Sequence, residues 1–247
     1  MGERRLCKPE VTGSIPVIST SLKVMEYDCY NLANYYKPKL ARQVRDILHR
    51  RVLKKIPTPK KVLEIGVGFG EFANFCKAKQ IEYVGLEPNE NLRQMVSKLG
   101  FKVYDGKLPD QVNVKGNDFD LVFIGHVLEH LPSYKEVLSS LENLRKLLKP
   151  GGHIIVLYPD ASYSRWLFYH DYTHQYVTTP RRMETIFQEV GLKVVESKNY
   201  VSCLVALAKP VFYVGKLFPY FLFPKQMAYF WRLSLSMNGF IVGKVQS

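Results

Sequence analysis

The stretch that decides the fold is Glu64-Ile65-Gly66-Val67-Gly68-Phe69-Gly70, which lies between an apolar run at 61–65 and a helical stretch at 71–79. Glycine allows the sharp turn and the close approach of a ligand to the backbone, so three of them at this place indicate a binding loop. A dinucleotide fingerprint, G-x-G-x-x-G, would need glycine at position 71, where the chain has Glu71. The loop therefore favours a ligand other than a nicotinamide or flavin dinucleotide.

Two acidic residues accompany this loop. Glu64 stands two positions before Gly66, and Glu87 ends the next apolar run, 82–87. A carboxylate beside the loop would repel a pyrophosphate and suits a cationic group, such as an ammonium or a sulfonium. An acid at the end of a second strand suits the hydroxyl pair of a ribose. Together these residues predict S-adenosylmethionine as the cofactor.

Beyond the loop, short β-branched runs alternate with helical stretches. Such alternation predicts βαβ units, and therefore a mostly parallel sheet with helices on both faces. The expected strands are 61–66, 82–87, 102–106, 120–125, 153–158, 191–197 and 240–245, and the expected helices are 39–56, 71–79, 89–99, 135–148 and 181–190.

Composition narrows the class of protein. The chain has 247 residues, of which 47% are hydrophobic and 23% charged, so wholesale disorder and coiled coil are excluded. Four scattered cysteines without a C-x-x-C pair fit a reducing compartment, and we expect a cytoplasmic protein. The net charge of +13 divides into +8 for 1–60, zero for 61–202 and +5 for 203–247. A neutral middle between basic flanks makes nucleic acid a disfavoured partner.

These changes in charge and composition along the sequence divide the chain into four parts. Residues 1–24 show no periodicity and are expected to be a disordered tail or translated sequence upstream of a start at Met25. Residues 25–60 are expected to form an N-terminal helical cap, and 61–202 the cofactor-binding core. Residues 203–247 would supply an aromatic, basic insertion and then the last strand.

The chain resembles the class I S-adenosylmethionine-dependent methyltransferases over about residues 61–200. The resemblance rests on the loop EIGVGFG, the acid in GLEP, the turn Tyr104-Asp105-Gly106, the segment DFDLVFIGHVLEHL and the segment LKPGGHIIV. It implies an α/β, Rossmann-like fold with a seven-stranded, mostly parallel sheet ordered 3-2-1-4-5-7-6 and helices on both faces. The aromatic stretch would then be a helical insertion before the last, antiparallel strand.

The resemblance also assigns roles by position. The glycines of the loop would wrap the methionine part of the cofactor, with Glu64 near its amino group and Glu87 on the ribose. The third-strand turn would lie by the adenine, and His126 would line the pocket of the methyl donor. The implied cofactor-binding residues are Glu64, Gly66, Gly68, Gly70, Glu87, Asp105, Gly106 and His126.

A first group of acceptor-site candidates, His126-Val127-Leu128-Glu129-His130, follows the fourth strand and is expected to open the next helix. Helical spacing would place its three polar side chains on one face. We favour a catalytic or cofactor contact without a metal, with His130 as a base near neutral pH. A divalent-metal site and purely structural hydrogen bonds are the alternatives. The metal version resembles the E-x-x-E-H pattern of some small-RNA 2′-O-methyltransferases and quinone-pathway O-methyltransferases, although the first position here is His126.

A second group, His170-Asp171-Tyr172-Thr173-His174, follows the fifth strand. It resembles the Asp-x-Thr-His segment of methyltransferases that act on sugars of surface polysaccharides. This resemblance implies that His174 faces the acceptor hydroxyl and that Tyr172 packs on the acceptor. Tyr158, at the end of the fifth strand, is expected to face the same crevice. The alternative is a loop whose polar side chains satisfy its own backbone.

Residues 204–235 contain nine aromatic residues, four cations and no acid. Their uncharged stretches are too short to span a membrane. Three interpretations stay open: peripheral contact with a membrane, a lid over an apolar acceptor, and a self-association face of a homodimer.

The leading hypothesis is an enzyme that methylates an oxygen of a sugar or a lipid-linked small molecule. A metal-assisted RNA 2′-O-methyltransferase and a non-catalytic, methyltransferase-like membrane partner are the alternatives. Nucleic-acid bases are disfavoured as acceptors. The Asn/Asp-Pro-Pro-Tyr/Phe turn of base amino-methyltransferases is replaced by Gly125-His126-Val127-Leu128, and no nucleophilic cysteine stands there.

Overall fold

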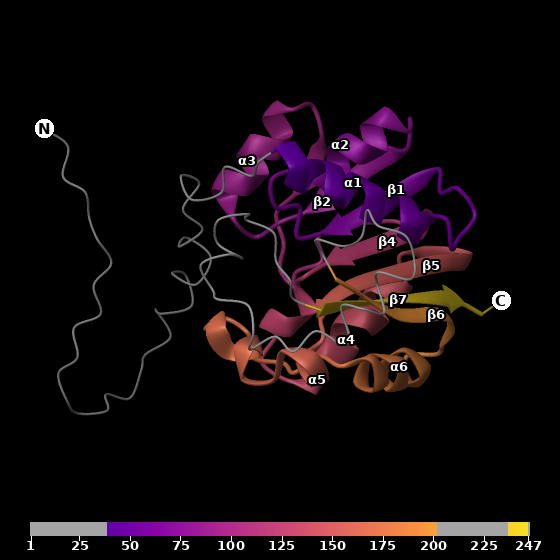
Figure 1. Cartoon of the computed structure of the whole chain (residues 1–247). Helices are drawn as coiled ribbons and strands as arrows, with labels where there is room; N and C mark the ends of the chain where they lie inside the picture. Colours follow the sequence, from indigo (N-terminus) through magenta and orange to yellow (C-terminus); the bar gives the residue numbers. More distant parts are fainter. Residues whose placement is uncertain (1–38, 202–236, 247) are drawn as a thin grey trace, which may run out of the picture. The chain divides into compact units, whose positions relative to one another are not determined.

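The computed structural model of the chain describes residues 39–201 and 237–246 (Figure 1). The expected tail at 1–24, the part of the cap before residue 39 and the aromatic segment 204–235 lie outside the described residues.

A seven-stranded sheet forms the centre of the described chain, in the order β3-β2-β1-β4-β5-β7-β6 (Figure 1). Strands β1 to β5 pair in parallel, and β7 is antiparallel to both β5 and β6. The predicted fold class and strand order are therefore confirmed. The strands are β1 Lys61–Ile65, β2 Glu82–Leu86, β3 Lys102–Tyr104, β4 Phe119–Gly125, β5 Leu148–Pro159, β6 Leu192–Val201 and β7 Met237–Val245.

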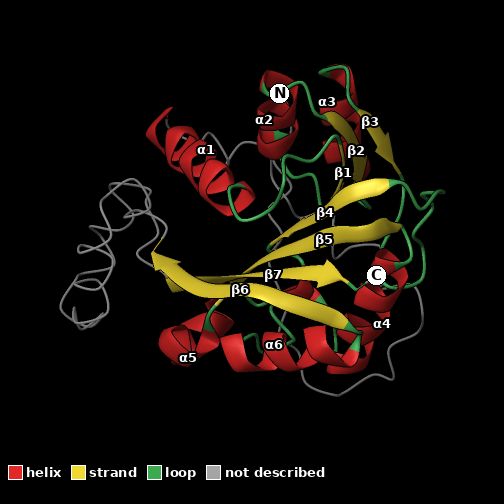
Figure 2. Ribbon diagram, turned by 90° about the vertical axis from the view of Figure 1, so that its right-hand side faces the viewer, coloured by secondary structure: helices red, strands yellow, loops and turns green. Residues whose placement is uncertain are grey.

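Helices cover both faces of this sheet (Figure 2). One face carries α1 Lys39–Leu53, α2 Glu71–Ala78 and α3 Glu90–Lys98, and the other carries α4 Tyr134–Arg145, α5 Ala161–Ser164 and α6 Pro180–Glu189. Successive side chains of a strand point to opposite faces, so β4 contributes to two cores. Leu121 and Phe123 pack with α1 and α2, whereas Val122 and Ile124 pack with α4 and α6.

Side-chain caps fix where several helices begin. The Asn89 side chain accepts the N–H of Leu92 at 3.0 Å at the start of α3. Ser133 caps α4, and Thr179 caps α6 with Pro180 directly after it. These are the residue types that best satisfy the free N–H groups of a first turn.

The expected helix start at His126 is wrong. His126 has a left-handed φ of 59°, and only a short 3₁₀ turn, η3 Leu128–His130, follows it. The α-helix begins later, at Tyr134, because Pro132 cannot donate to a helix already under way and Ser133 supplies the cap. It also ends earlier than expected, because β5 begins at Leu148.

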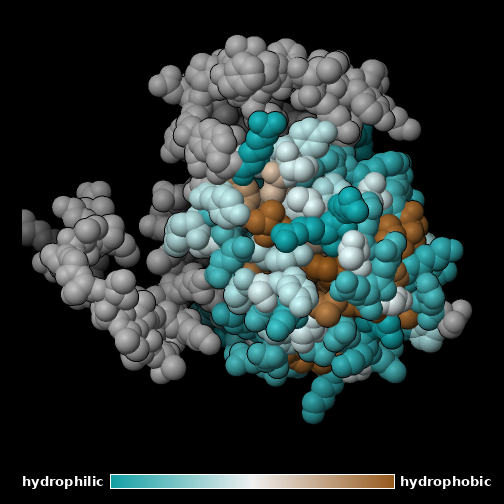
Figure 3. Space-filling view, turned by 90° about the horizontal axis from the view of Figure 1, so that it is seen from below, coloured by the Kyte–Doolittle hydropathy of each residue, from teal (hydrophilic) through white to brown (hydrophobic). Residues whose placement is uncertain are grey.

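The face that carries α4, α5 and α6 is mostly hydrophilic, with small hydrophobic groups scattered over it (Figure 3). Three exposed tyrosines, Tyr163, Tyr169 and Tyr172, lie on the segment after β5, part of which is the 3₁₀ turn η4 Arg165–His170. None of the described helices has the length and apolar character needed to cross a bilayer.

Candidate active site

The glycine loop turns between β1 and α2 as its sequence predicts. Gly66, Gly68 and Gly70 have φ values of 75°, 48° and 72°, in the left-handed region that favours glycine. The Gly66 N–H donates to the carbonyl of Leu86 at 2.9 Å, which ties the loop to β2. A Cβ at Gly68 would meet no atom within 4 Å, so open space lies beside this glycine. We expect a ligand to enter this space, here called the cradle, at the carboxyl end of β1.

Glu87 lies directly after β2 and holds the glycine loop. Its carboxylate accepts the N–H of Asn89 at 2.9 Å, and the backbone N–H groups of Val67 and Gly68 also donate to it. Burial raises the pKa of Glu87, and these hydrogen bonds oppose that rise. The predicted ribose-binding acid is thus beside the cradle, where a bound ligand with hydroxyl donors could replace the backbone donors.

Glu64 is more enclosed than expected. It is buried, and the hydroxyl of Tyr83 donates to its Oε2. Burial raises the pKa of Glu64 well above its usual value, and the Tyr83 hydrogen bond only partly offsets this. A nearby cation would stabilise the ionised form, which keeps Glu64 a candidate partner for the cofactor amino group.

Contacts within the protein shape the third-strand turn. Gly106 is buried, and a Cβ there would lie 2.2 Å from the carbonyl oxygen of Gln111 and 2.5 Å from Leu86. Glycine is therefore required at this position for packing within the protein, without any ligand. Asp105 is exposed, and its carboxylate pairs with Arg93 at 2.9 Å.

The segment after β4 carries the first acceptor-site candidates. His126 is 44% exposed, and its Nδ1 lies 3.2 Å from Oε1 of Glu129. Glu129 itself is only 1% exposed, and its second oxygen, Oε2, is buried without a hydrogen-bond partner. A carboxylate oxygen left without a partner in a protein interior is costly and calls for a ligand or a functional role.

The segment after β5 meets this group at the carboxyl end of the sheet. The N–H groups of Gln175 and Tyr176 donate to the carbonyl of Glu129 at 2.8 and 3.0 Å. The rings of His130 and His174 come within 5.0 Å of each other between centroids. The structure therefore joins the two predicted catalytic histidines, which come from different loops.

Both histidines are held by hydrogen bonds to Nδ1. His174 Nδ1 lies 2.7 Å from the carbonyl oxygen of Phe168. A carbonyl only accepts, so the Nδ1 proton is fixed there and Nε2 keeps its lone pair in the neutral ring. His130 Nδ1 lies 2.9 Å from Oγ1 of Thr173, whose own hydroxyl donates to Asp171 at 2.6 Å. His130 is therefore held in the same tautomer.

Asp171 and Thr173 belong to the second predicted group, but the sequence assigned neither of them a role. Burial alone would raise the pKa of Asp171, but the hydroxyl and N–H of Thr173 donate to it and lower the pKa below its usual value. The two residues form a local turn of the Asp-x-Thr type, a signal that was present in the sequence. Their role is to orient His130.

The two predicted acceptor-binding tyrosines differ in position. Tyr172 is 79% exposed on the loop beside His174, where it is free to contact a substrate. Tyr158 is fully buried in the core on the α4–α6 side of the sheet, against Gly239 of β7. The expectation that Tyr158 faces the crevice is wrong, because its position in β5 directs it to the core.

Among the described residues, one group of side chains could hold a metal ion. Glu129, His130 and His174 each offer one ligand atom, and these atoms lie within 4.8 Å of one another.

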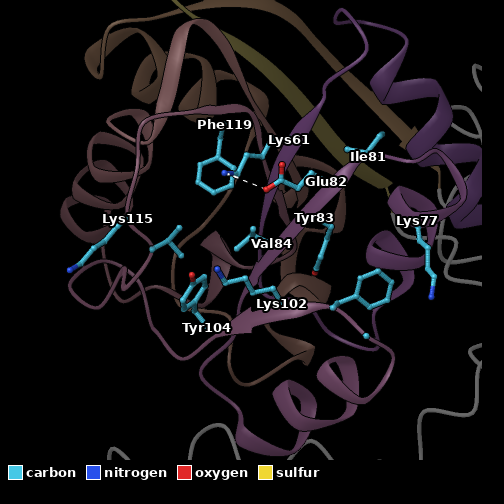
Figure 4. A pocket seen from close by; sticks show the side chains of 13 residues that line it. Lys61, Lys77, Ile81, Glu82, Tyr83, Val84, Lys102, Tyr104, Lys115 and Phe119 are labelled. Atoms are coloured by element: carbon cyan, nitrogen blue, oxygen red, sulfur yellow. Dashed lines mark ion pairs between the residues drawn. The ribbon is translucent and has the colours of Figure 1, made fainter.

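A separate pocket of about 450 Å³ opens at the amino ends of the strands (Figure 4). Its lining combines four lysines, Lys61, Lys77, Lys102 and Lys115, with aromatic rings. It contains none of the described residues predicted for the site, which lie at the opposite, carboxyl ends. In open α/β sheets the carboxyl ends carry the ligand, so this pocket is not the cofactor site.

The fold, the left-handed glycine loop and the acid after β2 define a class I S-adenosylmethionine-dependent methyltransferase. The chain belongs to the methyltransferase domain family, whose model matches residues 36–197. It is therefore a methyltransferase, with S-adenosylmethionine as its cofactor.

Individual relatives agree with this assignment. The chain is 27% identical over 147 residues to the ubiquinone biosynthesis O-methyltransferase of Vibrio atlanticus, a match that covers 56% of this chain and 60% of that enzyme. The fold is similar to that of a SAM-dependent methyltransferase from Archaeoglobus fulgidus, with a TM-score of 0.58, 22% identity and coverage of 82% and 94%. It is also similar to a Haemonchus contortus phosphoethanolamine N-methyltransferase bound to S-adenosylhomocysteine, with a TM-score of 0.58, 16% identity and coverage of 83% and 53%.

Proposed function

We propose that this methyltransferase transfers the methyl group to an oxygen of a sugar or a lipid-linked small molecule. The observation that carries the proposal is the pair of histidines on the loops that follow β4 and β5, each held through Nδ1 so that Nε2 keeps its lone pair. Nε2 of His174 lies 3.8 Å from Oδ2 of Asp171. A neutral imidazole is the side chain best suited to take a hydroxyl proton near neutral pH. The O-methyltransferase of ubiquinone biosynthesis that resembles this chain supports an oxygen acceptor.

The residues of the site have separate roles in this proposal. The bound cofactor supplies an electrophilic methyl group with a good leaving group, so alignment of the acceptor provides much of the catalysis. The loop at 66–70 and Glu87 hold the cofactor, and His126 lies at the edge of its pocket. His130 or His174 receives the acceptor proton through Nε2, and Tyr172 packs against the acceptor.

The direct test is a screen of glycan and lipid extracts with a labelled methyl donor, followed by kinetics of His130→Gln and His174→Gln. General-base catalysis contributes on the order of 10²- to 10⁴-fold, so we expect kcat to fall by about that factor. The affinity for S-adenosylmethionine should stay unchanged. His153→Gln, in the middle of β5, is the matched control.

Two results would overturn the proposal. Both histidine variants could keep kcat within a few-fold of the original enzyme, which would remove them from proton transfer. Alternatively, the labelled methyl group could appear on a nitrogen or on an RNA ribose, which would change the class of acceptor.

We also propose that residues 204–235 bring the enzyme to a membrane surface, where a lipid-linked acceptor would lie. Composition supports this, since aromatic residues and cations without acids suit the interface of a bilayer. Co-sedimentation with anionic liposomes should be lost when residues 208–234 are removed. Equal sedimentation of both forms, or dimerisation through the segment, would contradict it.

A further inference from the structure

We propose that Glu129, His130 and His174 form a binding site for a divalent first-row transition-metal ion. The sequence alone favoured histidines that act without a metal. Three features of the tertiary structure, which the sequence could not show, favour the ion. The inference rests on the proposed function and changes one step of it. With an ion bound, Nε2 of each histidine is a ligand, and the acceptor proton passes to solvent instead of to an imidazole.

The first feature is the unpaired carboxylate oxygen. Glu129 is 1% exposed and its Oε2 has no hydrogen-bond partner, although its backbone carbonyl accepts two N–H groups from the loop after β5. The other oxygen, Oε1, lies 3.2 Å from His126. His126 therefore orients the carboxylate and leaves Oε2 free. Residues that hydrogen-bond to a metal ligand orient it in the same way.

The second feature is the state of the two imidazoles. Metal-binding histidines usually donate their second ring N–H to a carbonyl or another polar group, which fixes the tautomer. His174 does this to the carbonyl of Phe168 at 2.7 Å, and His130 to Thr173 at 2.9 Å. In each neutral ring Nε2 then keeps its lone pair, and Nε2 of His174 lies 3.8 Å from Oδ2 of Asp171.

The third feature is the spacing of the three side chains, since one possible ligand atom of each lies within 4.8 Å of those of the other two. Two atoms about 2.1 Å from one ion are roughly 3 Å apart at a right angle and about 4.2 Å apart when opposite. Small side-chain rotations of about one to two ångströms therefore close the site around an ion.

The chemistry of the ligands selects the ion. Mg²⁺ and Ca²⁺ prefer oxygen ligands, whereas imidazole suits ions such as Fe²⁺, Co²⁺, Ni²⁺ and Zn²⁺. Two histidines and one carboxylate leave coordination positions open. An acceptor hydroxyl bound at one of them would lose its proton to solvent more readily, because the cation lowers the pKa of a coordinated oxygen.

The test uses the full-length chain, freed of any affinity tag and treated with chelator, and Co²⁺ as the probe. Visible absorption and calorimetry should show one Co²⁺ bound in the absence of S-adenosylmethionine. Glu129→Gln and His174→Gln should each weaken this binding at least tenfold. Glu142→Gln, the same substitution at an exposed site on α4, should bind like the original chain.

The outcomes separate the two proposals. Absence of stoichiometric Co²⁺ binding, or equal binding by the folded Glu129→Gln and His174→Gln variants, would overturn the metal site and leave the proposed O-methyl transfer standing. Folding of each variant is checked by its melting temperature. Co²⁺ binding that depends on both residues, in a protein that methylates no hydroxyl acceptor, would support the metal site and contradict the proposed function.

Discussion

Replacement of Gly68 by alanine should separate the stability of the glycine loop from its capacity to hold the cofactor. Gly68 has a φ of 48°, and a Cβ there would meet no protein atom within 4 Å. A left-handed residue other than glycine costs about 1–2 kcal/mol. For a domain of this size that cost corresponds to a fall in melting temperature of about 2–8 °C, so Gly68→Ala should fold.

The methyl group of this variant would occupy space that we assign to the cofactor. Overfilling a packed site typically costs about 1–3 kcal/mol, which is roughly a 5- to 150-fold loss in affinity. Calorimetric titration with S-adenosylmethionine measures that loss, and thermal unfolding measures stability. Gly100→Ala is the matched control, because Gly100 also has a left-handed φ, 88°, and free space around it, but lies after α3.

Gly66→Ala provides the contrast. Its Cβ would lie 2.6 Å from Cγ2 of Val127, so the clash is added to a left-handed φ of 75° and the loss of stability should reach about 2–5 kcal/mol. The additional change Val127→Ala should restore the part that comes from the clash. If the folded Gly68→Ala variant binds the cofactor as tightly as Gly100→Ala does, the space beside Gly68 is not the cofactor pocket. If Val127→Ala restores nothing, the steric argument at Gly66 is wrong.

Two buried titratable groups give opposite dependences of stability on pH. Burial among Phe72, Phe75 and Phe123 lowers the pKa of His49 to about 4. The contribution of neutral His49 to the stability of the folded protein is therefore present above the unfolded pKa of about 6.5 and is lost as the pH falls toward 4. Between about pH 7.5 and about pH 5, the free energy of unfolding measured with urea should fall by about 2 kcal/mol more for the original chain than for His49→Leu. Parallel losses in the two proteins would contradict this. For Glu64 the raised pKa works in the other direction: stability is present below the usual value of 4.5 and is lost as the pH rises through the folded value. The melting temperature of Glu64→Gln relative to the original chain should therefore increase from weakly acidic to alkaline pH, and a constant difference would refute the assignment.

Local sequence was sufficient for the elements whose signals lie within a few residues. The glycines at 66–70 predict a left-handed turn because other residues pay a steric cost there. The alternation of β-branched runs and helical stretches predicts a parallel sheet covered on both faces. The strand order itself came from the resemblance to known methyltransferases, and the structure confirms it.

Local sequence was insufficient where a side chain had to be assigned to one face or to a partner far along the chain. Helical spacing predicted one face for His126 and His130, but a left-handed residue and Pro132 prevent a helix there. Gly106 has the pattern of a ligand-contacting glycine, yet its neighbours within the protein already require it.

The sequence by itself determined the fold class, the cofactor loop and the acid after β2, because each depends on a short run of residues with its own backbone preference. The tertiary structure decided which groups meet at the carboxyl end of the sheet. It buried Tyr158, since a strand covered on both faces carries no local sign of which face a given side chain joins. It also brought His174 to His130 and left one oxygen of Glu129 unpaired, because loops that follow neighbouring parallel strands converge only once the sheet has formed.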